Sequence, residues 1–286
     1  MLIIVGAIVV SVCVFGGFTI HGGNLAVLWQ PEEMIIIVGA AIGSLIIQSP
    51  MSVIKDIIHQ LIGALKGKEV TKAQYTEVLL LMYDIIKTAK GNPLSLESHV
   101  EKPEGSDIFK KYPYVLSNHH ALGFICDTLK VQISSPVSPY DLEDLMDKDI
   151  ETVHHIESLA PASLNKVSDA MPGLGIVAAV LGVVITMGKL TAGKEVIGHS
   201  VGAALVGTFI GILISYGFMG PLAAKMDSVL ADHGQVLTVI KSGLLAFAKD
   251  CSPKVCVEFA RRTIPPAVRP SFEEVDKATS GAKAAA

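Results

Sequence analysis

The sequence predicts an all-α membrane protein with four transmembrane helices and a helical cytoplasmic domain inserted between the second and the third. Three observations support this prediction. Half of the 286 residues are hydrophobic and only 17% are charged, whereas roughly a quarter of the residues are charged in an ordinary soluble domain. No Asp, Glu, Lys or Arg occurs in residues 1–31, between Asp169 and Lys189, or between Glu195 and Lys225. Most of the 23 Lys and Arg residues gather instead in two polar segments.

The uncharged stretches contain four apolar runs near the length needed to cross the roughly 30 Å hydrocarbon core, which takes about 20 helical residues. They are residues 1–20, 34–49, 172–188 and 199–221. The second run can extend back through residue 31 or past residue 50 if its helix tilts. The first run has no Lys or Arg ahead of it and no small-x-small cleavage site, so we expect a permanent anchor rather than a signal peptide.

The distribution of positive charge predicts the orientation. Residues 51–169 contain 12 Lys and Arg and residues 222–286 contain 9, while residues 189–198 contain 2 and residues 21–30 none. Because loops rich in Lys and Arg stay in the cytoplasm, we expect both long segments and both termini there, in a multi-pass inner-membrane protein. The expected divisions are residues 1–50 for spans one and two, 51–168 for the cytoplasmic domain, 169–221 for spans three and four, and 222–286 for a cytoplasmic helix and tail.

The polar segments show helical patterns and no catalytic motif. Apolar residues between 75 and 86 recur at intervals of three and four, which predicts a helix with one buried face. Residues 140–160 and 226–249 are expected to form further helices. No Gly-rich phosphate loop, Ser/His/Asp set or HExxH pattern occurs, so we expect neither an enzyme nor a cofactor. The histidine pairs at 119–120 and 154–155 point to different sides of a helix and predict no metal site. A net charge of −4 offers no basic face for nucleic acid.

The apolar runs are expected to carry no ionisable group at their centres. A proton or sodium pathway needs a group in the bilayer that takes up and releases charge, so a partner must supply that carboxylate if the chain conducts ions. Nine glycines lie in the last two runs, which favours close packing of those two helices. Thr186 and Thr208 add uncharged hydroxyls. Pro172 and Pro221 mark helix boundaries or hinges, because proline removes a backbone hydrogen bond.

Several local patterns are similar to those of one family. Residues 204–213 are ALVGTFIGIL, followed after seven residues by Pro221, and residues 172–182 are PGLGIVAAVLG. Both resemble the motifs of the last two spans in the MotA/PomA stator subunits of the bacterial flagellar motor. Shorter resemblances are SLE at 95–97, MDKDIET at 146–152 and RPSF at 269–272. The resemblance extends in order over nearly the whole chain.

This resemblance implies a ring of five copies around two copies of MotB, whose single transmembrane helix carries the proton-accepting Asp. It also implies that ion flow turns the ring and that the cytoplasmic domain drives the rotor protein FliG through charged residues. Carried over by position, Pro172 and Pro221 have the conformational role. The implied ion-path residues are Thr208, Ala179 and Thr186, and the implied rotor-facing residues are Glu97, Lys90 and Asp149.

Two departures from the family pattern bear on this function. The family's basic rotor-facing residue would fall at Ala89, so Lys90 or another lysine would have to supply the positive charge. The other candidates are Lys87, Lys110 and Lys111. Sodium-type members carry Thr where this chain has Ala179, which adds an oxygen ligand near Thr208. The absence of that oxygen predicts that the translocated ion is H⁺ rather than Na⁺.

Two other classes of function stay open at this point. ExbB/TolQ energy transducers resemble the last two spans, but they usually have three spans, with the cytoplasmic domain after the first. A small-solute transporter is expected to show inverted repeats or broken helices around a midplane site, and the two pairs of spans share no visible pattern. The motor subunit is therefore the leading hypothesis.

Overall fold

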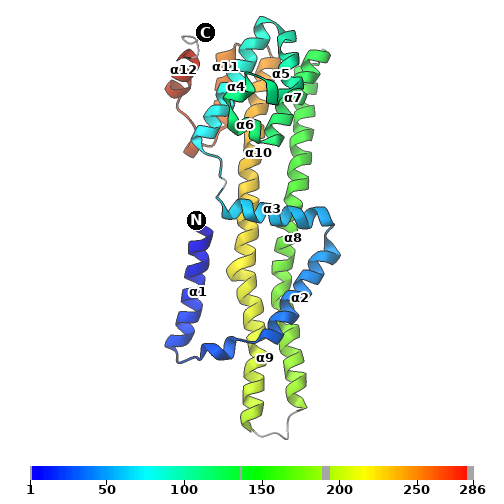
Figure 1. Cartoon of the computed structure of the whole chain (residues 1–286), viewed down its shortest axis with the longest axis vertical. Coiled ribbons are helices and arrows are strands. Elements are labelled where there is room, and N and C mark those ends of the chain that lie inside the picture. Colours follow the sequence, from blue (N-terminus) through cyan, green and yellow to red (C-terminus); the bar gives the residue numbers. More distant parts are fainter. Residues whose placement is uncertain (1, 68, 136, 189–193, 282–286) are drawn as a thin grey trace. The chain divides into compact units, whose positions relative to one another are not determined.

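The computed structural model of the chain describes residues 2–67, 69–135, 137–188 and 194–281. Within those residues every regular element is a helix, as the sequence predicts. The chain forms two compact units: unit 1 comprises Met1–Lys68 and Glu157–Val229, and unit 2 comprises Glu69–Ile156 and Leu230–Ala286. Two of the three divisions fall inside the long helices α8 (Pro139–Met187) and α10 (Gly220–Ala248) (Figure 1).

Among the described residues, four helices are long and apolar enough to cross a membrane, which agrees with the predicted four spans. The elements of unit 1 are α1 (Leu2–Ile20), η1 (Leu25–Leu28), α2 (Pro31–Gln48), α3 (Met51–Leu65), the second part of α8, α9 (Lys194–Ile214), the π-helical segment η5 (Ser215–Met219) and the first part of α10. The third apolar run is only one part of α8, which has 49 residues. Pro172 therefore lies inside a helix and does not mark a helix boundary.

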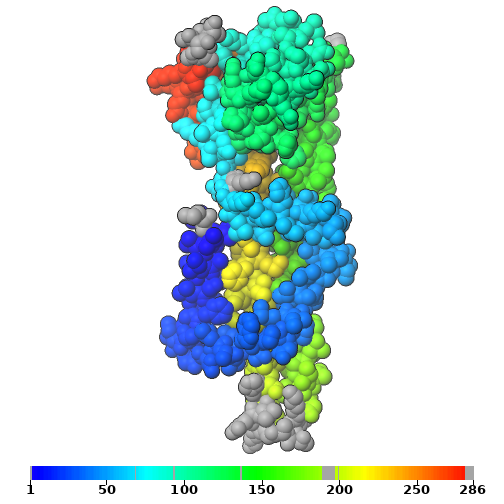
Figure 2. Space-filling model, in the orientation of Figure 1, coloured from blue at the N-terminus to red at the C-terminus, as the bar shows by residue number. Residues whose placement is uncertain are grey.

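The core of the membrane helices lies where α2 crosses α9 and α8 (Figure 1). Ile37 and Ala41 of α2 form one apolar cluster with Val206 and Ile210 of α9 and with Ala178 of α8. In contrast, α1 buries none of its residues. Figure 2 shows that the region around η5 remains visible at the surface between α1 and α2. Apolar helix surface exposed to this extent is suited to lipid or to further membrane helices.

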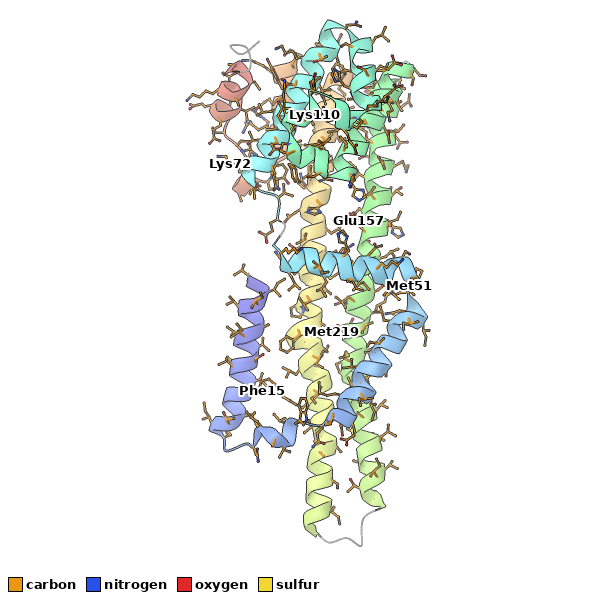
Figure 3. All side chains as sticks on the ribbon, in the orientation of Figure 1. Phe15, Met51, Lys72, Lys110, Glu157 and Met219 are labelled. Atoms are coloured by element: carbon orange, nitrogen blue, oxygen red, sulfur yellow. The ribbon has the colours of Figure 1, made fainter. Side chains whose placement is uncertain are left out.

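The short helix α3 packs against the two long helices of unit 1. Its buried residues share an apolar cluster with α8 and α10, which consists of Val53, Ile57, Ala64, Ala160, Leu164, Ala223 and Met226. The side-chain amide of Gln60 adds a polar contact, since it donates to the main-chain carbonyl of Glu157 over 2.9 Å. Figure 3 labels Glu157 on α8. Helix α3 thus belongs to the same compact unit as the spans.

The compact units group the chain in another way than the predicted segments, which separate membrane spans from cytoplasmic residues. The prediction ended the second span at residue 50, began the third at residue 169 and ended the fourth at residue 221, where apolar runs meet charged residues. The compact units divide at residues 68, 156 and 229, which are not span boundaries, so the predicted boundaries stay predictions. The units divide there because α3 and the adjoining turns of α8 and α10 share a buried cluster. Charge along the chain does not reveal which helices such residues pack against.

Unit 2 is built around α4 (Lys72–Gly91), whose predicted apolar face is buried. A capping box begins this helix: the Thr71 hydroxyl accepts from the Gln74 N–H, and the Gln74 side chain accepts from the Thr71 N–H. The other elements are the first part of α8, the second part of α10, and η2 (Pro93–Leu96), α5 (Glu97–Glu101), η3 (Pro103–Gly105), η4 (Phe109–Lys111), α6 (Pro113–Ser117), α7 (His119–Ser134), α11 (Pro253–Thr263), η6 (Pro266–Val268) and α12 (Phe272–Gly281).

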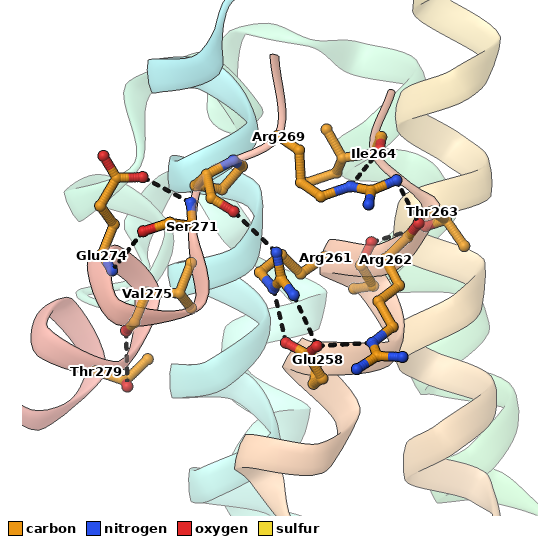
Figure 4. A network of polar contacts seen from close by, with 12 residues as sticks. Glu258, Arg261, Arg262, Thr263, Ile264, Arg269, Ser271, Glu274, Val275 and Thr279 are labelled. Atoms are coloured by element: carbon orange, nitrogen blue, oxygen red, sulfur yellow. Dashed lines mark hydrogen bonds and ion pairs between the residues drawn. The ribbon is translucent and has the colours of Figure 1, made fainter. Parts of the chain in front are cut away.

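The carboxy-terminal part of unit 2 carries a network of charged groups (Figure 4). The Glu258 carboxylate accepts hydrogen bonds from Arg261 at 2.7 and 2.8 Å and from Arg262 at 2.8 Å. The bonds from Arg261, aided by the bond from Arg262, hold the pKa of Glu258 at about 2, well below its ordinary value. Arg261 also donates to the carbonyl of Pro270 over 3.1 Å. The network thereby connects α11 to the RPSF segment.

Candidate functional site

The two helices that hold the predicted ion-path residues, α8 and α9, approach each other closely in unit 1. A Cβ placed on Gly211 of α9 would lie 2.6 Å from the carbonyl oxygen of Met171. A Cβ placed on Gly175 of α8 would lie 2.8 Å from the carbonyl oxygen of Gly207. Because main-chain atoms cannot move aside as a flexible side chain can, the contact requires glycine at both positions. The predicted close packing of these two helices is confirmed.

The predicted ion-path residues lie along this helix pair. Thr208 is half-buried, and its Cα lies on the side of α9 that faces Gly175. Ala179 is also half-buried and follows Gly175 by one helical turn. Thr186 is buried, and its hydroxyl donates to the Gly182 carbonyl over 2.8 Å. The structure thus brings Thr208 and Ala179 to one stretch of the pair, whereas the Thr186 proton is bonded within its own helix.

The two prolines occupy different environments. Pro172 lies inside α8 and is half-buried, next to the Met171 carbonyl that approaches Gly211. Pro221 is exposed and is the second residue of α10, directly after η5. A π-helical turn and a helix-internal proline both interrupt regular backbone hydrogen bonding. Each proline therefore lies where the helix can bend. Pro172 follows the residue whose carbonyl approaches Gly211, whereas Pro221 is ten residues beyond Gly211, so the two prolines lie at different heights along the helix pair.

The reasoning from sequence missed a polar contact between α8 and η5. Ser168 of α8 and Ser215 of η5 are both buried. The Ser168 hydroxyl donates to the main-chain carbonyl of Ser215 over 3.1 Å, and the two hydroxyl oxygens lie 3.4 Å apart. The contact joins the irregular turn to α8. Nothing in the sequence signals it, because the two serines are 47 positions apart.

Glu33, in the first turn of α2, is a second residue that the reasoning from sequence missed. The sequence places it just before an apolar run, and the expectation that no ionisable group lies at the centre of a span did not concern it. In the structure Glu33 is 8% exposed, and a Cβ placed on Gly207 would overlap its Oε2 atom. Gly207 is 12 residues after Glu195 and 18 before Lys225, the nearest charged residues of the fourth span. A residue at the start of one apolar run thus lies beside another run, because α2 crosses α9 far from the ends of the fourth span (Figure 1).

The predicted rotor-facing residues lie in unit 2. Lys90 is exposed near the end of α4, and its ammonium group lies 3.0 Å from the carbonyl oxygen and 3.2 Å from Oδ1 of Asp250. Glu97 begins α5 and Asp149 lies on α8, and both are exposed. Ala89 is only 2% exposed, so a charged side chain there would have to enter the core. An exposed charge next to Ala89 is supplied by Lys90. Lys87, Lys110 and Lys111 are exposed as well.

Comparison with known proteins identifies the relatives of this chain. Residues 4–93 match the family model described as Motility protein A N-terminal. Residues 119–235 match the model of the MotA/TolQ/ExbB proton channel family. The chain is 39% identical to Motility protein A of Escherichia coli (strain K12) over 279 residues, which are 97% of this chain and 94% of that protein. The chain belongs to the MotA/TolQ/ExbB proton channel family.

Further relatives in the MotA/TolQ/ExbB family also match over nearly the full length. Chemotaxis protein LafT of Vibrio parahaemolyticus is 36% identical over 273 residues, which are 95% of this chain and 96% of that protein. The solved structure of Campylobacter jejuni MotAB has the same fold, with a TM-score of 0.76, 17% identity and coverage of 92% and 95% of the two chains. The flagellar MotAB stator complex from Bacillus subtilis gives a TM-score of 0.73 at 21% identity, with coverage of 93% and 96%.

These relationships decide among the three classes of function considered from the sequence. The similarity to motility proteins covers both pairs of spans and both units. The protein is therefore a stator ion-channel subunit of the flagellar motor and a multi-pass protein of the inner membrane. The ExbB/TolQ-type transducer and the solute transporter do not account for the match over residues 4–93.

Proposed function

We propose that this chain is the ring-forming subunit of a proton-driven stator. Five copies surround two copies of a single-span partner of the MotB type, whose membrane helix carries a proton-accepting Asp. The similarity to a MotAB stator complex supports such an assembly. The uncovered apolar surface supports it too: Ile176, Val180 and Val184 recur every fourth residue along α8 and are each more than half exposed. Neighbouring copies, the partner and lipid cover this surface.

The observation that carries the proposal is the α8–α9 contact. It combines closely packed main chains with the Thr208 hydroxyl, while the spans of α8 and α9 contain no Asp, Glu, Lys or Arg at their centres. Because a proton path needs a titratable group within the bilayer, the partner's Asp completes the path beside these helices. Ala179 leaves the path without the additional oxygen that a sodium ion favours. The translocated ion is therefore H⁺.

Ion flow turns the ring around the partner, and exposed charges of unit 2 act on the rotor protein FliG. The candidates are Lys90, Glu97 and Asp149. The concentration of Lys and Arg in the two long polar segments supports a cytoplasmic location for unit 2 and both termini. Pro172 and Pro221 permit the bending that connects proton uptake to this movement, since each interrupts the regular helix.

The test uses cells that lack their own stator and express this chain with its single-span partner. Swimming speed is expected to stay unchanged when sodium in the medium is replaced by potassium, and a speed that collapses without sodium would contradict the choice of H⁺. Pro172→Ala and Pro221→Ala are expected to abolish swimming while the complex still co-purifies. Pro253→Ala is the matched control, because Pro253 begins α11, where a missing N–H costs little. Full motility of both variants would sink the proposed hinge.

A further inference from the structure

Among the side chains that the structure describes, Glu33 is the only buried Asp, Glu, Lys or Arg. Its Oε2 atom is buried and has no hydrogen-bond partner. Its neighbour Glu32 is exposed. An ionised carboxylate without a partner is strongly disfavoured in such surroundings, so the position of Glu33 calls for a specific chemical role.

Helix capping does not supply that role. Glu33 is the third residue of α2, a position from which a glutamate can reach back to the main-chain N–H of the N-cap residue. The N-cap residue is Gln30, and no side-chain cap hydrogen bond forms at this end of α2. The carboxyl group lies against α8 and α9 instead.

Glycines on both of those helices provide the space for the carboxyl group. A Cβ placed on Gly207 of α9 would overlap Oε2, and a Cβ placed on Gly182 of α8 would lie 3.4 Å from Oε1. At 1.5 Å per residue, Gly207 is about 18 Å along the helix from Glu195 and about 27 Å from Lys225. These distances place the carboxyl group beside the middle of the fourth apolar run and away from the charged residues that flank that run.

The surroundings of the carboxyl group are suited to the binding of a proton and not of a metal cation. The nearest titratable residues along α2 and α9 are Glu32 and His199, and α8 has no charged residue between Asp169 and Lys189. The side chain of Ala178 also lines the position beside Gly207. Glycine and alanine offer no side-chain oxygen, whereas a metal cation needs several oxygen ligands. A single proton neutralises the carboxylate without any further ligand.

We propose that Glu33 is a proton-binding site that this chain itself contributes to the membrane path, in addition to the Asp of its partner. The carboxylate takes up one proton, and the neutral carboxyl group then occupies the space between Gly182 and Gly207. Loss of that proton leaves an unpartnered carboxylate, which destabilises the contact of α2 with α9. No other bond forms or breaks. The inference rests on the proposed function, because it requires that protons cross the membrane beside α8 and α9.

The first test measures proton flux through the complete complex of this chain and its partner in lipid vesicles. Glu33→Gln keeps the size of the side chain and removes its titration, so flux is expected to fall at least about tenfold. Glu33→Asp is expected to retain part of the flux, and the matched control Glu32→Gln to stay within about twofold of the wild type. Equal flux through Glu33→Gln and wild type would overturn the inference.

A second test does not depend on flux or on the folding of one variant. Infrared spectra of the purified complex across pH are expected to show a protonated-carboxyl band that titrates, disappears in Glu33→Gln and persists in Glu32→Gln. Gly207→Ala, whose Cβ overlaps Oε2, is expected to shift the midpoint of that titration. If the midpoint is unmoved and no band belongs to Glu33, the inference fails while wild-type flux remains. If the wild-type complex carries no protons, the proposed function fails instead.

Discussion

The α8–α9 contact of unit 1 and the core of unit 2 are packed by opposite means. In unit 2, large apolar side chains such as Tyr75, Phe109 and Ile86 are fully buried. Between α8 and α9, Gly175 and Gly211 bring main chains together. In water, burial of apolar surface contributes about 25 cal/mol per Å², whereas lipid tails are as apolar as the side chains, so membrane helices gain from close packing. Smaller side chains in the core should therefore destabilise unit 2, and larger side chains at the glycine positions should destabilise the α8–α9 contact.

The largest effect is expected from a large-to-small change in unit 2. Leu79 of α4 is 0% exposed, so Leu79→Ala leaves a cavity and should lower the free energy of unfolding by about 2–5 kcal/mol. The measurement is chemical unfolding of the purified protein, followed by circular dichroism. Leu94→Ala is the control, because Leu94 is 66% exposed. Similar losses of unfolding free energy in the two variants would contradict the view that buried apolar volume stabilises unit 2.

The converse change tests the helix pair. Gly211→Ala adds one methyl group that would lie 2.6 Å from the Met171 carbonyl oxygen, so the helices must separate, at a cost of about 1–3 kcal/mol. Gly202→Ala in the same helix is the control, since its Cβ would have no neighbour within 4 Å in this chain. The yield of assembled complex and its proton flux measure the outcome. A Gly211→Ala complex that assembles and conducts normally would show that the close contact is not needed.

Acid should destabilise unit 2 through a carboxylate that its partners keep ionised. The pKa of Glu258 is about 2 in the folded protein, against 4.5 for the free group. Because the folded value is the lower one, this contribution is fully present above about pH 4.5 and is lost as the pH falls toward 2. We expect a loss of about 1–2 kcal/mol across that window, seen as a falling melting temperature.

The matched variants for the acid titration are Glu258→Gln and Glu273→Gln. Glu258→Gln should lose this part of the pH dependence of stability. Glu273→Gln should keep it, because Glu273 is exposed. An acid-side slope that persists in Glu258→Gln would show that other carboxylates are responsible.

The smallest effect is expected at the exposed ion pair of unit 2. The Asp250 side chain is 97% exposed where it pairs with Lys90, so Asp250→Asn should change stability by less than about 0.5 kcal/mol. Asn also tolerates the backbone φ of 62° at this position. Asp250→Ala should cost more, because alanine adopts positive φ less readily. Thermal unfolding of the two variants separates backbone conformation from charge, and equal melting temperatures would contradict this reasoning.

Much of the architecture could be predicted, because apolar length and helical periodicity are local properties. The four spans and the buried face of α4 are confirmed. Predictions failed where a residue's neighbours come from elsewhere in the chain. Pro172 was a candidate boundary and lies inside α8. The family position at Ala89 turned out to be buried, and Lys90 carries the exposed charge next to it.

The sequence by itself determined four apolar helices, the polar segments that carry most Lys and Arg, and the small residues that let α8 and α9 approach. Only the tertiary structure decided that Ser168 bonds to Ser215 and that Glu33 is buried beside Gly182 and Gly207. The physical reason is that a residue's place in the chain tells how far it is from the end of its own helix. Whether the residue is buried depends on where that helix crosses its neighbours, and Glu33 lies in the first turn of α2 beside the middle of α9.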